Sequence, residues 1–207
     1  MKSNEKIDNL KYENNLTQKG YSLIAGIDEV GRGPLAGPVC CACVIMPLDD
    51  IIEGVDDSKK ISEKKREKLY DEIIAKAICY SVMFVDEKTI DEINILEATK
   101  LCMKNAIESM EIKPDIVLVD AVKGLDVTVP TLPIIHGDAL SYNIAAASII
   151  AKVTRDRLMI SLAEKYPEYG FEKHKGYGTK AHIDAIKKYG VLSIHRKSFL
   201  GFLNEQH

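Results

Sequence analysis

The stretch AGIDEVGRGPLAGPV, residues 25–39, decides how the rest of the chain is interpreted. An apolar run over 23–27 leads into two adjacent carboxylates, Asp28 and Glu29, and the turn GRGP over 31–34 follows almost at once. Two acids beside glycine backbone amides and an arginine suit a divalent cation and a phosphate. The pattern therefore predicts a buried strand whose end carries a binding loop.

The same glycines also resemble a dinucleotide-binding fingerprint, because Gly31, Gly33 and Gly37 follow a predicted strand. Their spacing is one residue too long for that motif. Pro34, Pro38 and a β-rich run come next, where a dinucleotide site needs the N-terminus of a helix. The sequence therefore argues against an oxidoreductase of the dinucleotide-binding class.

Composition predicts one domain of ordinary size with an aliphatic core. Of the 207 residues, 46% are hydrophobic and only 6% aromatic, and tryptophan is absent. No apolar run reaches the roughly 18 residues of a membrane span, and the N-terminus lacks the apolar region of a secretory signal. Five cysteines, an odd number, favour a reduced protein. We expect a cytoplasmic protein with no membrane partner, monomeric by default.

Three of the cysteines lie in a run of strand character over 39–46. In such a strand Cys41 and Cys43 share one face, and Cys40 points to the other. No second pair of cysteines or histidines completes a zinc site at a familiar spacing. We therefore expect small buried strand residues rather than metal ligands.

Hydrophobic periodicity predicts an α/β fold with a mixed sheet flanked by helices. Strand-like runs occur at 22–28, 39–46, 80–85, 116–120 and 132–136, and helical patterns at 62–77, 95–111, 141–164 and 179–189. The link between the first two strands is too short for a crossover helix, so they should be antiparallel. Strands after residue 110 alternate with helices and can be parallel. The helix over 141–164 is apolar on more than one face and should be largely buried.

Charge is unevenly distributed along the chain. The net charge of −3 by itself argues against a nucleic-acid partner, but residues 171–200 hold seven lysines and arginines against two acids. A local basic face on a mildly acidic protein is typical of contact with a phosphate backbone. A solvated helix surface with no ligand would carry the same charges, so this clue alone leaves both interpretations open.

Three aspartates end or follow predicted strands, namely Asp28, Asp120 and Asp138. Ligand-binding groups in open α/β sheets gather at such strand ends. Converging carboxylates repel each other, so a cluster needs cations, and oxygen ligands select magnesium or manganese. Any one acid alone could be a helix cap or a salt-bridge partner, but three together favour a metal site. Adjacent strand residues face opposite ways, so Glu29 can join Asp28 only if the strand ends or kinks between them.

Six ordered blocks of the sequence resemble motifs of the bacterial type 2 ribonucleases H, the ribonuclease HII family. They are GIDEVGRGPLAGPV at 26–39, DSKKIS at 57–62, PDIVLVD at 114–120, GDALSYNIAAASIIAKVTRDR at 137–157, HKGYGTKAH at 174–182 and HRKSF at 195–199. The resemblance implies a ribonuclease H-like fold, α/β with a mixed five-stranded sheet flanked by helices. It also implies a catalytic core over 21–166 and a C-terminal helical substrate-binding extension over 167–207, whereas residues 1–20 are expected from their composition to form a polar N-terminal arm.

The resemblance also implies a reaction and its catalytic residues. The four acids of the family match Asp28, Glu29, Asp120 and Asp138, which would hold Mg²⁺ or Mn²⁺ in a two-metal mechanism. The implied activity is an endoribonuclease that hydrolyses the RNA strand of RNA–DNA hybrids. It would also cut 5′ to single ribonucleotides embedded in duplex DNA, leaving 3′-hydroxyl and 5′-phosphate ends.

Substrate recognition follows from the same resemblance. The 2′-hydroxyl separates RNA from DNA, and in this family the Gly31-Arg32-Gly33 turn and the tyrosine matching Tyr177 grip the ribose at an RNA–DNA junction. Tyr177 alone would more often be a half-buried surface residue, but flanking glycines in a basic segment favour the functional role. Further expected phosphate contacts are Lys59, Lys175, Arg196 and Ser198. The alternative function is a non-catalytic module that binds RNA–DNA hybrids, which the loss of one acid would have favoured.

Overall fold

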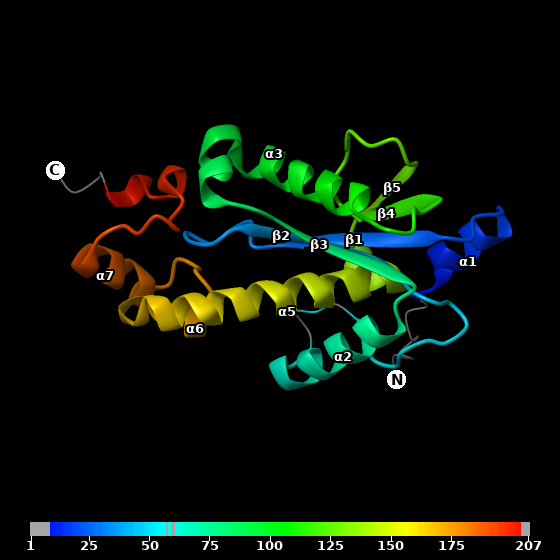
Figure 1. Cartoon of the computed structure of the whole chain (residues 1–207), viewed down its shortest axis with the longest axis horizontal. Helices are drawn as coiled ribbons and strands as arrows, with labels where there is room; N and C mark the ends of the chain where they lie inside the picture. The colour runs from blue at the N-terminus through cyan, green and yellow to red at the C-terminus, as the bar shows by residue number, and fades with distance from the viewer. Residues whose placement is uncertain (1–8, 57, 59–60, 204–207) are drawn as a thin grey trace, which may run out of the picture.

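The chain forms a five-stranded mixed sheet with helices on both faces (Figure 1). The computed structural model describes residues 9–56, 58 and 61–203. The strands, in spatial order, are β3 (Cys79–Val85), β2 (Val39–Ile45), β1 (Ile24–Val30), β4 (Ile116–Asp120) and β5 (Thr131–Ile134). The neighbours β1, β2 and β3 are antiparallel, whereas β4 is parallel to β1 and β5 to β4. The predicted class, the mixed sheet and the antiparallel first pair are confirmed.

Helices cover the sheet on both sides and extend past one end of it. One face carries α3 (Glu87–Glu108), and the other carries α5 (Tyr142–Lys165) with α2 (Glu63–Lys76) packed against it (Figure 1). The remaining helical segments are α1 (Lys11–Gln18), α4 (Gly137–Leu140), η1 (Pro167–Tyr169), α6 (Phe171–His174), α7 (Lys180–Tyr189), η2 (Lys197–Phe199) and η3 (Gly201–Leu203). Within the described residues, no helix is long and apolar enough to cross a membrane.

The sheet separates two hydrophobic cores, and β2 contributes to both. Cys41 and Cys43 pack with α3, and Cys40 packs with α5, so the predicted alternation of buried cysteines is confirmed. The predicted burial of the long helix is also confirmed, since α5 is apolar on several faces. It lies directly on β1, where a Cβ atom on Gly26 would come 2.2 Å from the backbone carbonyl carbon of Asn143. Only glycine permits this backbone contact.

The helix predicted over 95–111 begins earlier, at Glu87, and contains a break at Asn94. Asn94 has φ 68°, and its Oδ1 accepts hydrogen bonds from the backbone N–H groups of Leu96 and Glu97. Asp86 caps the preceding short segment by accepting from the backbone N–H of Thr89. Apolar periodicity revealed only the longer part because the break at Asn94 shifts the phase of the pattern.

The first helix, α1, closes the N-terminus of α5. Leu16 packs into a small core with residues of β1, β4 and α5. Glu13 is fully buried, and its Oε1 accepts from Ser141 Oγ at 2.6 Å and from the backbone N–H of Asn143 at 3.1 Å. The carbonyl of Asn9 accepts from the backbone N–H of Tyr142. A segment that the sequence marked only as polar therefore holds the helix that follows Asp138.

We expect Glu13→Ala to lower the free energy of unfolding by about 1–3 kcal/mol, because buried donors of Ser141 and Asn143 lose their acceptor. Glu13→Gln keeps an acceptor oxygen and should cost less. Denaturant unfolding curves measure both changes, with Asn14→Ala, an exposed position on the same helix, as the control. Equal losses for Glu13→Ala and Asn14→Ala would contradict the role of Glu13.

Glu13 also predicts a pH dependence of stability. Burial raises the pKa of Glu13 above its ordinary value of 4.5. Over the pH range between the unfolded and the folded pKa, the carboxyl group of Glu13 is protonated in the folded chain and ionised in the unfolded chain. The stability that Glu13 contributes is therefore fully present below the unfolded pKa and is lost as pH rises through the raised pKa. Glu13→Gln removes the ionisation, so its pH–stability curve should decline less over that range, and parallel curves would refute the prediction.

Candidate active site

Asp28 and Asp120 lie side by side on neighbouring parallel strands. The register pairs Ile27 of β1 with Val119 of β4, so the next residue of each strand stands at the same level. Asp28 is only 5% exposed. Burial raises the pKa of Asp28 well above its ordinary value, and the negative charges of Glu29 and Asp120 raise it further. The sheet thus brings together three of the four predicted acids in a site that disfavours their charge.

The strand does not end between Asp28 and Glu29, which was one of the two conditions set for both side chains to reach one metal. β1 continues to Val30, and Glu29 pairs with Cys41, because β2 extends alongside this stretch. Glu29 lies 3.4 Å from Arg32, and its Oε2 is buried without a hydrogen-bond partner among the described residues. Burial raises the pKa of Glu29, Arg32 lowers it, and Asp120 raises it again. Asp28 and Glu29 therefore both interact electrostatically with Asp120, although the strand continues through them.

Helix α4 places Asp138 near the same cluster, because the preceding residue, Gly137, contacts Asp120. The backbone N–H of Gly137 donates to Asp120 Oδ1 at 2.8 Å, and a Cβ atom on Gly137 would lie 3.2 Å from that oxygen. Asp138, the next residue, is 7% exposed. The preceding His136 has φ 58°, a left-handed conformation that turns the chain from β5 into α4. Glycine at 137 thus lets α4 approach the carboxylate of Asp120 closely.

A divalent cation suits the chemistry of these residues. Within the described part of the chain, no group of three or more His, Cys, Asp or Glu side chains is already gathered as a metal site. Asp28, Glu29 and Asp120 nevertheless repel one another, and one buried oxygen of Glu29 has no donor among the described residues. Both are features that a hard cation would relieve, because it supplies positive charge to oxygen ligands.

The glycine loop, residues 31–37, lies beside the acids and next to Tyr177. Gly31 has φ 90°, and a Cβ atom there would fall 2.2 Å from Arg155 Nε. Gly33 is exposed, and its missing Cβ would stand 3.7 Å from the Tyr177 ring. Arg32 is exposed as well. The structure therefore brings together the two elements that sequence reasoning assigned to ribose recognition, although they are far apart in the chain.

Two buried arginines hold this loop. Arg196 is fully buried and donates to the backbone carbonyls of Gly31 at 2.5 Å, Arg32 at 2.9 Å and Gly37 at 2.6 Å. Burial, followed by the neighbouring Arg155, lowers the pKa of Arg196 to about 10, so it remains a cation at neutral pH. Expected as a phosphate contact, Arg196 has its donors directed into the protein. Sequence alone could not separate these two roles of a basic residue.

Arg155 joins the glycine loop to the turn before Tyr177. It is fully buried and donates to the backbone carbonyls of Pro38 at 2.9 Å, Ala36 at 3.1 Å and Lys175 at 3.0 Å. The two sides of the candidate ribose site therefore share one guanidinium. Sequence reasoning did not single out Arg155.

The other expected phosphate contacts have different surroundings. Lys175 is half-buried, and its Nζ donates to the carbonyl of Glu172. Ser198 is exposed, and both its hydroxyl and its backbone N–H donate to Asp91 on α3. Lys59 lies outside the described residues. Within the described chain, then, Lys175 is close to Tyr177, and Ser198 is held by α3.

Sequence reasoning also missed Ser148, which contacts the acid cluster from α5. A hydrogen bond from Ser148 favours the charged form of Asp28, and Ser148 Oγ lies 2.8 Å from Ser58 Oγ. Ser141, Ser148 and Arg155 are spaced seven residues apart, so they share one face of the helix. Polar residues at this spacing in an otherwise apolar helix are the signal that could have identified them.

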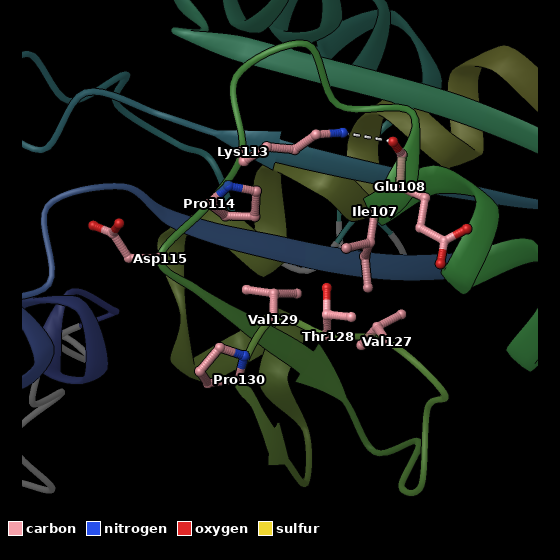
Figure 2. A pocket seen from close by; sticks show the side chains of 9 residues that line it. All are labelled: Ile107, Glu108, Lys113, Pro114, Asp115, Val127, Thr128, Val129 and Pro130. Carbon is pink, nitrogen blue, oxygen red and sulfur yellow. Dashed lines mark hydrogen bonds between the residues drawn. The ribbon is translucent and has the colours of Figure 1, made fainter.

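A cavity of about 420 Å³ lies elsewhere, between the end of α3 and the segments that lead into β4 and β5 (Figure 2). Its lining includes Ile107, Pro114, Val129 and Pro130. These residues precede the strands, whereas Asp120 ends β4 and Asp138 follows β5. The cavity is therefore separate from the acids, the glycine loop and Tyr177.

Comparison with known proteins gives one consistent result. Residues 25–201 match the family model described as Ribonuclease HII. A protein named Ribonuclease HII from Caldicellulosiruptor saccharolyticus is 60% identical over 91% of this chain and 92% of its own length. The ribonuclease H2 of Pyrococcus horikoshii OT3 is 32% identical with a TM-score of 0.73, over 86% of this chain and 93% of that chain. The ribonuclease HII of Archaeoglobus fulgidus, solved in a complex with PCNA, is 30% identical with a TM-score of 0.73, over 85% and 94%.

The arginine contacts predict a stability effect that is separate from any substrate. We expect Arg196→Lys to lower the free energy of unfolding by about 2 kcal/mol or more, because lysine cannot span the carbonyls of the glycine loop. Denaturant unfolding measures the change. The control is Lys197→Ala, which removes an exposed side chain at the next position. If Arg196→Lys is as stable as this control, Arg196 does not hold the loop.

Proposed function

This chain belongs to the ribonuclease HII family, and on that premise we propose that it cuts duplex DNA on the 5′ side of single embedded ribonucleotides. As a member of this family it is a hydrolase, an endoribonuclease that acts on RNA–DNA hybrids. The proposed chemistry is metal-dependent hydrolysis that leaves 3′-hydroxyl and 5′-phosphate ends. The observation that carries it is the cluster of Asp28, Glu29 and Asp120, in which Glu29 and Asp120 raise the pKa of Asp28 and Asp120 raises that of Glu29.

In this proposal Asp28, Glu29, Asp120 and Asp138 hold two divalent cations, Mg²⁺ or Mn²⁺. When bound, such cations activate a water molecule and stabilise the charge on the phosphate and on the leaving oxygen. The protein's own contribution is to orient the carboxylates. The backbone N–H of Glu29 donates to Asp28 Oδ1 at 2.7 Å, and the N–H of Gly137 holds Asp120 in the same way.

Ribose recognition is proposed to occur between the glycine loop and Tyr177. Gly33 is exposed and has no side chain, so a sugar can approach the backbone there closely. The Tyr177 ring is 41% exposed and stands beside Gly33, where its hydroxyl could contact a 2′-hydroxyl. The glycine loop cannot move away freely, because Arg155 and Arg196 bind its carbonyls.

The basic C-terminal extension is proposed to follow the phosphate backbone. Lys187 and Lys188 are exposed near the end of α7, and Lys188 Nζ lies 4.8 Å from the ring centre of Tyr189. Exposed lysines beside an aromatic ring suit a nucleic-acid strand. The chain is proposed to act as a monomer in the cytoplasm.

A single assay separates catalysis from binding. A DNA duplex with one embedded ribonucleotide is incubated with the protein and Mg²⁺ or Mn²⁺, and the products are resolved on a sequencing gel. Cleavage 5′ to the ribonucleotide supports the proposal. Tight binding without cleavage would instead favour a non-catalytic module that binds hybrids.

We expect Asp28→Asn and Asp120→Asn each to lower kcat by more than about 10²-fold, since each removes a charge from the cation site. Fluorescence anisotropy should show that both variants still bind the duplex. The control is Asp126→Asn, a solvent-exposed position with 96% side-chain exposure. Activity of either variant within a few-fold of the unmodified protein would refute the metal assignment.

We expect Tyr177→Phe and Tyr177→Ala to reduce cleavage at the single ribonucleotide more than they reduce duplex affinity, because the first removes the hydroxyl proposed to contact the 2′-hydroxyl and the second removes the ring as well. Tyr80→Phe, a tyrosine of similar exposure on β3, is the matched control. Affinity for an all-DNA duplex should stay the same in both Tyr177 variants. An equal loss of affinity for all-DNA duplex would remove Tyr177 from ribose recognition.

A further inference from the structure

Three histidines gather beneath Tyr177, away from the acid cluster. His174 ends α6, His182 lies in the first turn of α7, and His195 follows α7 in the chain. The rings of His174 and His182 are stacked with centroids 4.5 Å apart, and His182 Nε2 lies 3.1 Å from His195 Nε2. His182 and His195 are 0% and 1% exposed, so they are not part of the basic surface. The proposed reaction gives these two buried side chains no role.

The hydrogen bonds around the rings determine which nitrogen carries each proton. Leu192 donates its backbone N–H to His195 Nδ1 at 2.9 Å, so the proton of a neutral His195 is on Nε2. That proton faces His182 Nε2, which must accept it. The proton of His182 is therefore on Nδ1, which donates to the backbone carbonyl of Tyr177 at 2.9 Å. The result is a one-way chain from Leu192 through His195 and His182 to Tyr177.

Both histidines have to be neutral for this chain to exist. A second proton on either ring would set two N–H groups against each other across the 3.1 Å contact. Burial lowers the pKa of His182 to about 4, with His174 and His195 as the ionisable neighbours that lower it further, and burial also lowers the pKa of His195. Phe171 packs edge-on against His182, and Tyr169 packs against His195. Both of these rings are uncharged at neutral pH.

The hydrogen bonds from Leu192 through the two histidines end at a turn with unfavourable backbone conformation. Lys175 and Gly176 both have left-handed backbone, with φ 51° and 87°. A non-glycine residue in this conformation costs free energy and persists only where its surroundings hold it. The carbonyl of Tyr177 accepts from the backbone N–H of Thr179 at 2.8 Å as well as from His182. The histidine pair therefore contributes to fixing the turn that presents the Tyr177 ring.

We propose that His182 and His195 are positioning residues for Tyr177 that hold its ring opposite the glycine loop. The next residue, Arg196, binds the carbonyls of that loop, so two consecutive side chains hold the two sides of the candidate ribose site. This inference rests on the proposed role of Tyr177 in ribose recognition. It assigns the histidines no contact with the substrate.

The first test needs no variant. Nitrogen-15 NMR of the histidine-labelled protein at neutral pH reports the protonated nitrogen of each ring. The expected result is a proton on Nδ1 of His182 and on Nε2 of His195. The reverse assignment on either ring would overturn the proposal, because the chain could not then end on the Tyr177 carbonyl.

The second test compares two substitutions at one position. His182→Phe keeps an aromatic ring but removes both hydrogen bonds, whereas His182→Asn keeps an N–H donor near the place of Nδ1. For the duplex with one ribonucleotide, His182→Phe should lower kcat/KM about 3–10-fold, which corresponds to the net value of one hydrogen bond. His182→Asn should recover most of the loss. Equal losses for the two variants would overturn the proposal.

A double-mutant cycle tests whether His182 acts through Tyr177. In a Tyr177→Ala background, His182→Phe should have little further effect, because the side chain it positions is gone. The same loss in both backgrounds would assign His182 a general structural role. Ile186→Val is the control for weakened packing of α7, since Ile186 is 2% exposed on the same helix. A similar loss of kcat/KM in Ile186→Val would also count against the proposal.

Hydrogen exchange separates failure of the inference from failure of the proposed function. If Tyr177→Ala cleaves normally, Tyr177 has no role in ribose recognition, and that part of the proposed function fails. Exchange of the Thr179 amide still tests positioning, because this N–H donates to the Tyr177 carbonyl. Faster exchange in His182→Phe, but not in Ile186→Val, supports the inference. Unchanged exchange in His182→Phe overturns it.

Discussion

The backbone contact between β1 and α5 is the constraint on which the site depends. Gly26 lets the first turn of α5 lie directly on the strand that carries Asp28 two residues later. From this position, one face of α5 presents a polar side chain every seventh residue. Ser141 meets Glu13, Ser148 meets Asp28, and Arg155 meets the glycine loop. A displacement of the helix along β1 would disturb all three contacts at once, so the packing of one glycine and the geometry of the site are linked.

The acids of β1 and β4 lie close to two buried arginines, and each group of like charges is unfavourable by itself. The acids on β1 and β4 repel one another, and Glu29 also has a buried oxygen without a partner among the described residues. Arg155 and Arg196 are buried against backbone carbonyls of the neighbouring glycine loop. Burial lowers the pKa of both arginines, and Arg155 lowers that of Arg196 further. Such an arrangement is costly for the protein alone. In the proposed complex, cations held by the acids and a substrate phosphate beside the glycine loop would compensate these charges.

Sequence reasoning found the groups that face a ligand and missed most of those that hold them. Strand periodicity and strand-end acids predicted the mixed sheet and the positions of Asp28 and Asp120, because both patterns are local. The contact of Glu13 with Ser141 spans 128 residues, and that of Arg196 with Gly31 spans 165. No local pattern distinguishes a buried arginine that binds carbonyls from an exposed one that binds phosphate. Sequence alone also left open whether the strand ends after Asp28, and the pairing with β2 continues it to Val30.

Three non-glycine residues with left-handed backbone lie next to candidate site residues, whereas a fourth, Asn94, lies at the break in α3. Ala121 follows Asp120 with φ 52°, His136 precedes the Gly137–Asp138 pair with φ 58°, and Lys175 precedes the Tyr177 turn with φ 51°. Each of these conformations costs about 1 kcal/mol or more, and each adjoins a candidate site residue. The carbonyl of Lys175 is bound by Arg155, and Ala121 donates its N–H to the carbonyl of Ile134 in β5. Contacts from other elements thus hold the turns at Ala121 and Lys175. These two turns therefore keep their shape only while β5 and α5 stay in place beside them.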